Sequence, residues 1–130
     1  MTRFLLICLG GAAGTGLRYV VSVLAARWLG AEFPYGTLVV NVAGSLAVGF
    51  IHQVSSSLPL ASDTARLALT VGVMGGFTTY SSFSYETIRL LEIGAWVAAG
   101  INVLVTTALC LAVCFFGIAL GRAVAASAGL

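Results

Sequence analysis

The last long stretch of the chain constrains its fold more than any other feature, because residues 95–121 contain no charged side chain. A helix of about 20 apolar residues crosses the hydrocarbon core of a bilayer, which is roughly 30 Å thick. Over the whole chain 60% of the residues are hydrophobic and only 8% are charged. Soluble domains carry about 25% charged residues, so this composition excludes a soluble fold. We therefore expect an all-α integral membrane protein.

Gly, Pro and Ser clusters divide the chain into four predicted transmembrane helices with short connections. Ser62 or Asp63 is expected to cap the third helix. No repeat or linker interrupts the pattern, so residues 1–130 are expected to form a single transmembrane domain. The predicted helices cover residues 3–28, 35–55, 64–91 with a break near 75–79, and 95–123.

The six arginines are balanced between the two ends of the four predicted helices. Orientation in the membrane follows the excess of Lys and Arg on cytoplasmic loops, so a balanced chain has no strong reason to choose one orientation. We hypothesise dual topology, in which two oppositely inserted copies pair about a two-fold axis in the membrane plane. The net charge of +2 is too small to indicate a nucleic-acid partner. Successive loops of a membrane protein lie on alternate sides of the membrane. This places Arg3, Arg66 and Arg122 on one side, and Arg18, Arg27 and Arg89 toward the other.

The third segment is interrupted by small and polar residues where a smooth apolar helix would be expected. Gly75 and Gly76 are followed by five Ser or Thr residues within positions 78–84. A broken helix is tolerated in a membrane only where protein or a cavity receives the freed backbone groups, so the break indicates a site. Unwound carbonyls at Gly75 to Thr78 can coordinate a hard cation such as sodium, and the next half-helix offers N–H groups to an anion.

Two other helices carry polar side chains at a spacing of four residues, which places them on one helix face. In the second helix these include Thr37 and Asn41, whose amide has two N–H donors that can replace water around an anion. In the fourth helix they include Asn102, Thr106 and Cys110. An interhelical hydrogen bond is the alternative for Asn41, and bonds to the carbonyls of its own helix are the alternative for Thr106.

Two aromatic residues, Tyr80 and Phe83, follow the break at a spacing that puts them on one helix face. Their electropositive ring edges can contact a small anion without holding it as tightly as a full charge, and packing is the alternative role. Glu86 and Arg89 are expected to form a structural pair near the membrane surface. Arg18 lies within an apolar run, so it is expected to snorkel to the interface or to cap an aqueous vestibule.

Three motifs, in this order, resemble the Fluc fluoride channels, also called the CrcB family. They are residues 10–19 (GGAAGTGLRY), 36–45 (GTLVVNVAGS) and 75–86 (GGFTTYSSFSYE). The resemblance implies a dual-topology homodimer, multi-pass in a bacterial inner membrane, with two fluoride pores and one central structural sodium ion. It places Asn41 and the ring edges at positions 80 and 83 in the pore, and assigns the carbonyls of Gly75 and Thr78 from both subunits to sodium. The further pore candidates are Thr37, Ser81, Thr106 and Cys110.

One residue departs from the family pattern, because the family usually has Phe where this chain has Tyr80. The added hydroxyl needs a hydrogen-bond partner and could either donate to fluoride or obstruct its passage.

The function that the resemblance implies is passive export of cytosolic fluoride, which lowers its toxicity. An enzyme is not expected, because a catalytic site needs a nucleophile, a base and an orienting group. One histidine and few acidic residues cannot supply this set. A small proton-coupled multidrug exporter would need a membrane-embedded carboxylate, and the first helix has none. A noncatalytic membrane assembly subunit would explain the glycines but not the polar break.

A tag at the C-terminus is expected to be found on both sides of the membrane, because the arginines are balanced. Adding two or three lysines near Arg3 is expected to bias the orientation and to reduce activity, since antiparallel pairs become rare. Accessibility of the tag to a membrane-impermeant reagent, measured from each side, checks both statements. Labelling from one side only would refute dual topology.

Overall fold

All of the regular structure is helical in the computed structural model, which describes residues 1–57 and 62–127; no strand occurs within these residues. This confirms the all-α prediction. The long helices are α1 (Thr2–Leu29), α2 (Tyr35–Ser57) and α6 (Trp96–Ser127). Between α2 and α6 lie four shorter pieces: α3 (Asp63–Leu67), the π-helical η1 (Ala68–Met74), α4 (Gly75–Phe77) and α5 (Tyr80–Glu92).

Local sequence explains where the helices begin and end. Gly30 follows α1 with a φ of 90°, and Gly94 lies in the α5–α6 turn with a φ of 79°; such angles favour glycine because it has no Cβ. Ser62 caps α3 as predicted, since its hydroxyl accepts a hydrogen bond from the Ala65 N–H at 3.2 Å. The prediction ended the last helix too early. α6 continues to Ser127 because residues 122–127 contain no Gly or Pro.

Among the described residues, three helices are long and apolar enough to cross a membrane: α1, residues 35–56 of α2, and α6. The remaining predicted span is divided, and its longest piece, α5, has 13 residues. Gly75 and Gly76 stay helical within α4, so the prediction that the backbone unwinds at Gly75 is wrong. The extended residues are Thr78 and Thr79, with ψ angles of 159° and 112°.

The distribution of side chains is inverted relative to a water-soluble protein. Large apolar side chains of α1 and α6 are exposed, such as Phe4, Leu104 and Phe115. The buried residues are a mixture of apolar and polar groups, and Val40 and Asn102 are the two largest fully buried side chains. A bilayer solvates apolar surface, whereas polar side chains must find partners between helices. The outer surface of the chain is therefore suited to contact with lipid.

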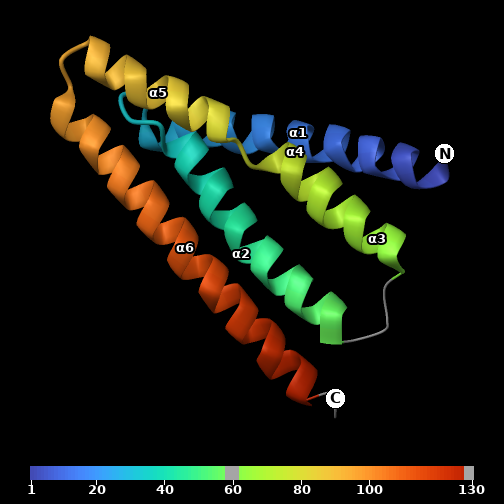
Figure 1. Cartoon of the computed structure of the whole chain (residues 1–130). Coiled ribbons are helices and arrows are strands. Elements are labelled where there is room, and N and C mark those ends of the chain that lie inside the picture. Colours follow the sequence, from blue (N-terminus) through green and yellow to red (C-terminus); the bar gives the residue numbers. More distant parts are fainter. Residues whose placement is uncertain (58–61, 128–130) are drawn as a thin grey trace.

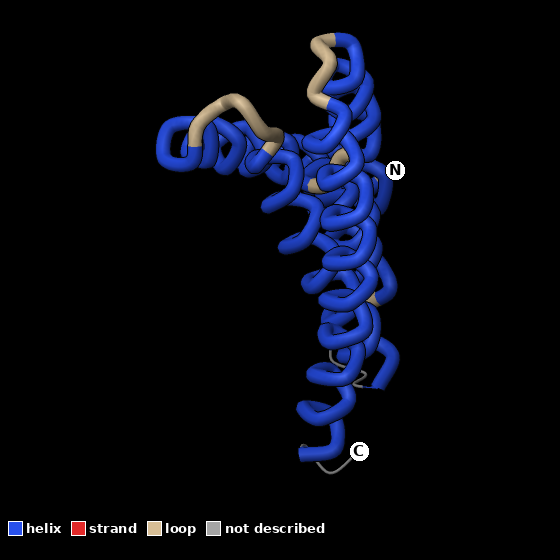
Figure 2. Tube along the Cα trace, turned by 90° about the vertical axis from the view of Figure 1, so that its left-hand side faces the viewer, coloured by secondary structure: helices blue, strands red, loops and turns tan. Residues whose placement is uncertain are grey.

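The helices are arranged as an open, elongated bundle. Figure 1 shows α2 and α6 side by side, with the α3–α4 segment on the other side of α2. In Figure 2, seen from the side, one helical arm projects away from the long axis of the bundle. Much of each helix surface consequently lies on the outside of this single chain.

Glycines allow the backbone of α1 to approach η1 and α4 closely. A Cβ at Gly10 would lie 2.7 Å from the Ala68 carbonyl oxygen, and a Cβ at Gly72 would lie 2.8 Å from the carbonyl oxygen of Ile7. A Cβ at Gly14 would meet backbone atoms on the same side. Small residues let helix backbones approach this closely, and these contacts hold the segment that precedes the extended residues.

We expect Gly14→Ala to lower stability by about 1–3 kcal/mol, because its Cβ would overlap the Val73 carbonyl oxygen and lie 2.9 Å from the Phe77 nitrogen. Gly16→Ala is the matched control on the same helix, since no atom lies within 4 Å of its added Cβ. The control should be neutral or stabilising by up to about 1 kcal/mol, because alanine favours helix over glycine. Thermal unfolding in lipid nanodiscs measures both; equal midpoints for the two variants would contradict the packing argument.

Candidate functional site

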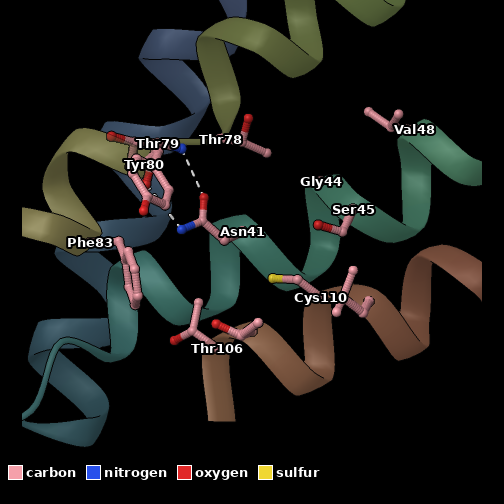
Figure 3. A pocket seen from close by; sticks show the side chains of 12 residues that line it. Asn41, Gly44, Ser45, Val48, Thr78, Thr79, Tyr80, Phe83, Thr106 and Cys110 are labelled. Carbon is pink, nitrogen blue, oxygen red and sulfur yellow. Dashed lines mark hydrogen bonds between the residues drawn. The ribbon is translucent and has the colours of Figure 1, made fainter. Parts of the chain in front are cut away.

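The two extended residues are held by a side chain of α2. The Asn41 Oδ1 accepts a hydrogen bond from the Thr79 N–H at 2.8 Å, and the Asn41 Nδ2 donates to the Thr79 carbonyl at 3.0 Å. Both bonds are drawn in Figure 3. An extended backbone has lost its helical hydrogen bonds, and each unpaired buried group costs several kcal/mol in lipid. The carboxamide of Asn41 therefore replaces the missing backbone partner of Thr79.

This pairing determines how Asn41 can serve a ligand. The Thr79 N–H can only donate and its carbonyl can only accept, so the amide orientation is defined by its partners. One of the two Nδ2 hydrogens is used by Thr79, and one remains. The prediction that Asn41 offers two N–H donors to an anion is corrected to one donor. The interhelical hydrogen bond, which was the alternative role for Asn41, is present.

Thr79 also begins α5. Its hydroxyl oxygen accepts from the Ser82 N–H at 3.2 Å, as an N-cap residue does, and the hydroxyl donates to the Ser82 Oγ at 3.0 Å. The Ser81 hydroxyl oxygen lies 3.2 Å from the Thr79 hydroxyl oxygen. On the other side of the break, the Thr78 hydroxyl donates to the Met74 carbonyl at 3.0 Å. Sequence reasoning did not single out Thr79, although it lies within the polar run that indicated a site.

A pocket of about 370 Å³ lies beside this break, between α2, the start of α5 and α6 (Figure 3). Its walls combine an amide, hydroxyls, a thiol and two aromatic rings, and none of the residues that line it carries a charge. They are Asn41, Gly44, Ser45, Val48, Thr78, Thr79, Tyr80, Phe83, Thr106, Thr107, Cys110 and Leu111.

The two aromatic rings form one side of the pocket. The centroids of Tyr80 and Phe83 are 5.5 Å apart with an angle of 44° between the planes, so the rings are tilted rather than stacked. Tilted pairs direct ring edges as well as faces toward their surroundings. Tyr80 is 80% exposed in the single chain, whereas Phe83 lies deeper. The predicted aromatic pair is thus brought to the same pocket as Asn41, Thr106 and Cys110.

Glu86 and Arg89 do not pair with each other, contrary to the prediction. Arg89 contacts Glu92 at 3.3 Å in an exposed ion pair, which contributes about 0–1 kcal/mol. Glu86 instead accepts a hydrogen bond from the buried hydroxyl of Thr37, with 2.9 Å between Oγ1 and Oε1. Glu86 and Arg89 both line a second pocket of about 210 Å³, which the loop that precedes α2 also borders.

The other predicted residues lie outside the first pocket. Thr37 is committed to Glu86, and Ser81 is exposed beside Thr79. Arg18 is half-buried on α1 and lines neither of these two pockets. Gly75 is exposed on α4. Residues 44, 45, 48, 107 and 111 join the pocket because α2 and α6 pack closely, which requires knowledge of helix pairing.

Comparison with known proteins matches residues 5–118 to the family described as "CrcB-like protein, Camphor Resistance (CrcB)". A protein of Sorangium cellulosum named "Fluoride-specific ion channel FluC" is 50% identical over 122 residues, which is 94% of this chain and 96% of that protein. A protein of Roseiflexus with the same name is 48% identical over 116 residues, covering 89% of this chain and 94% of its own length. A third, from Geobacter sulfurreducens, is 44% identical over 122 residues, with coverages of 94% and 98%.

We expect Asn41→Asp to lower stability by about 1–3 kcal/mol, because a carboxylate oxygen would replace the N–H that faces the Thr79 carbonyl. Ser45→Ala, one turn along the same helix, removes a polar group of the pocket without touching Thr79 and should change stability by no more than ~0.5 kcal/mol. Thermal unfolding of the purified variants compares the two. An Asn41→Asp protein as stable as the control would mean that the pairing with Thr79 does not support the break.

Proposed function

The chain belongs to the CrcB-like family, and on this basis we propose that it is a fluoride-specific ion channel. It is a multi-pass protein of the cell membrane and not an enzyme. The observation that carries the proposal is the likeness to relatives named fluoride-specific ion channels, 44–50% identical over nearly the whole chain in the three reported comparisons. The channel lets fluoride leave the cytosol and so lowers its toxicity.

The uncharged pocket supports a pathway for a small, strongly hydrated anion. Fluoride must lose water to enter a narrow pore, and the free N–H of Asn41 and the ring edges of Tyr80 and Phe83 replace part of that water. Conduction requires that each contact be weak enough for the ion to leave. A cationic side chain would hold fluoride more tightly, and the residues that line the pocket include none. Thr106 and Cys110 form the opposite wall.

Export requires no energy source beyond the membrane potential. Hydrogen fluoride enters cells as a neutral weak acid and dissociates inside. An inside-negative potential favours exit of a monovalent anion by about 2.3 kcal/mol per 100 mV. A passive pore therefore suffices, and no nucleotide-binding loop is needed in the chain.

The channel is a homodimer of oppositely oriented copies, with residues 63–92 as the fourth, broken span. The even distribution of arginines supports dual topology. Exposure supports the second copy: Tyr80, which is 80% exposed, and the exposed Ser81 beside it would face lipid in a single chain, which is unfavourable for their hydroxyl groups. A partner that covers this face turns the half-open pocket into an enclosed pathway.

A structural sodium ion at the centre of the dimer is compatible with the backbone around the break. The Thr79 N–H donates to Asn41 and not to the Gly75 carbonyl, four residues before it. The Ser82 N–H donates to the Thr79 hydroxyl and not to the Thr78 carbonyl. Both carbonyls are thus without their usual helical donor, and hard cations prefer such oxygen ligands. The Gly75 and Thr78 carbonyls of the two copies would hold sodium and join the broken spans.

Liposomes that contain the purified protein test the proposed function. Vesicles loaded with fluoride or with chloride are given a defined potassium potential with valinomycin, and the released anion is followed with an ion-selective electrode. We expect fast fluoride efflux and almost no chloride efflux. Equal efflux of the two anions would remove the claim of selectivity, and no fluoride efflux from the assembled protein would remove the proposed function.

Two aromatic variants test the pathway. Phe83→Ile is expected to stop fluoride efflux, because it removes a ring edge from the pocket, whereas Tyr80→Phe is expected to preserve or raise it. Tyr80→Phe removes only a hydroxyl, so its cost is limited to a hydrogen bond of about 0.5–1.5 kcal/mol. Efflux is measured on variants that remain folded and assembled. Loss of efflux in Tyr80→Phe would mean that the phenol itself is an essential ligand.

A further inference from the structure

A chain of buried and partly buried hydrogen bonds connects α6 to the backbone of Phe83. Asn102 of α6 is 1% exposed, and its Nδ2 donates to the Thr87 hydroxyl at 2.9 Å. The Thr87 hydroxyl in turn donates to the Phe83 carbonyl at 2.7 Å. At the other end, the Thr106 hydroxyl donates to the Asn102 Oδ1 at 3.3 Å. The Asn102–Thr87 bond crosses from α6 to α5, and both this bond and the Thr106–Asn102 bond are buried, so little water can compete for them.

The directions of these bonds make asparagine the side chain that satisfies both neighbours. The Thr87 hydroxyl has one hydrogen, and because that hydrogen is given to Phe83, its oxygen can only accept from α6. The Thr106 hydroxyl donates its hydrogen toward the side chain at position 102, so that side chain must also supply an acceptor. A carboxamide supplies the donor and the acceptor together. Leucine has a similar size but supplies neither, and aspartate lacks the donor.

We propose that Asn102 is a positioning residue, which fixes the backbone of Phe83 against α6 through Thr87 and so determines where the Phe83 ring lies in the pocket. The inference rests on the proposed function, in which that ring edge contacts fluoride. Phe83 and Thr106 face the same pocket, so the bonds tie two of its walls together behind the lining surface. A misplacement of about 1 Å at a site that depends on orientation reduces a rate by up to ~100-fold.

The same bonds assign a different role to Thr106. The single hydroxyl hydrogen of Thr106 is donated to Asn102. As long as this hydrogen bond is formed, Thr106 presents only oxygen lone pairs and a methyl group to the pocket. A hydroxyl in this state does not donate to an anion. Thr106 therefore belongs to the support of the ring, and the N–H of Asn41 is the clearer donor on the pocket wall.

The test places fluorophenylalanine at position 83 of the full-length protein in lipid nanodiscs and records its fluorine NMR signal in fluoride-free buffer. Asn102→Leu and Thr87→Val are compared with Thr87→Ser, which keeps the hydroxyl. Thr70→Val is the matched control, because the Thr70 hydroxyl donates to the Arg66 carbonyl at 2.8 Å in the same manner but lies in η1, away from the pocket. Fluoride efflux of the same variants without the label is measured in liposomes.

We expect Asn102→Leu and Thr87→Val to shift or split the signal and to slow fluoride efflux by about tenfold or more, the change that one unsatisfied buried bond produces. Thr87→Ser and Thr70→Val should leave both readouts unchanged. An unmoved signal in folded Thr87→Val overturns the proposal, even if efflux falls, and this variant decides the question if Asn102→Leu does not fold. A wild-type protein that conducts no fluoride overturns the proposed function alone, because the NMR comparison still reports the ring position.

Discussion

The pairing of the Asn41 carboxamide with the backbone of Thr79 is the interaction on which the site depends. Two extended residues in the middle of a helical segment release backbone groups that lipid cannot satisfy. Asn41 supplies a donor and an acceptor in the spacing of a peptide group, so a side chain on α2 takes the place of the missing backbone partner. The break then starts a new helix at Tyr80, capped by the Thr79 hydroxyl, and the two pocket rings lie on its first turns.

Glycines and buried polar groups cooperate in holding the elements that surround the break. In lipid no hydrophobic effect drives helices together, so close backbone contact and interhelical hydrogen bonds must do so. Gly10 and Gly14 bring α1 onto η1 and α4, which anchors the chain before Thr78. Asn102 and Thr87 join α6 to α5, which anchors the chain after Thr79. The extended residues are thus held from both sides as well as by Asn41, and this gives the pocket walls a defined geometry.

The pocket is polar without being charged, and this property connects its structure to conduction. The Asn41 amide has one N–H left for a ligand, the Thr106 hydroxyl is engaged by Asn102, and the rings contribute only their quadrupoles. In the proposed pathway, several weak contacts replace hydration without trapping the ion. Tyr80 is exposed at the side of the pocket, and the second copy in the proposed homodimer would cover its hydroxyl, which hydrocarbon cannot satisfy.

The sequence by itself determined the membrane class, the helical elements and the position of the polar run, because these depend on apolar length, capping and breakers that act locally. It also brought Asn41, Tyr80 and Phe83 forward as site residues, and the structure gathers them at one pocket. Only the tertiary structure decided the partners. Glu86 accepts a hydrogen bond from Thr37 and does not pair with Arg89. One of the two N–H donors of Asn41 is hydrogen-bonded to the Thr79 carbonyl. Such partners belong to residues 38 or 49 positions apart, so they follow from how α2 packs against the broken segment, which no local pattern specifies.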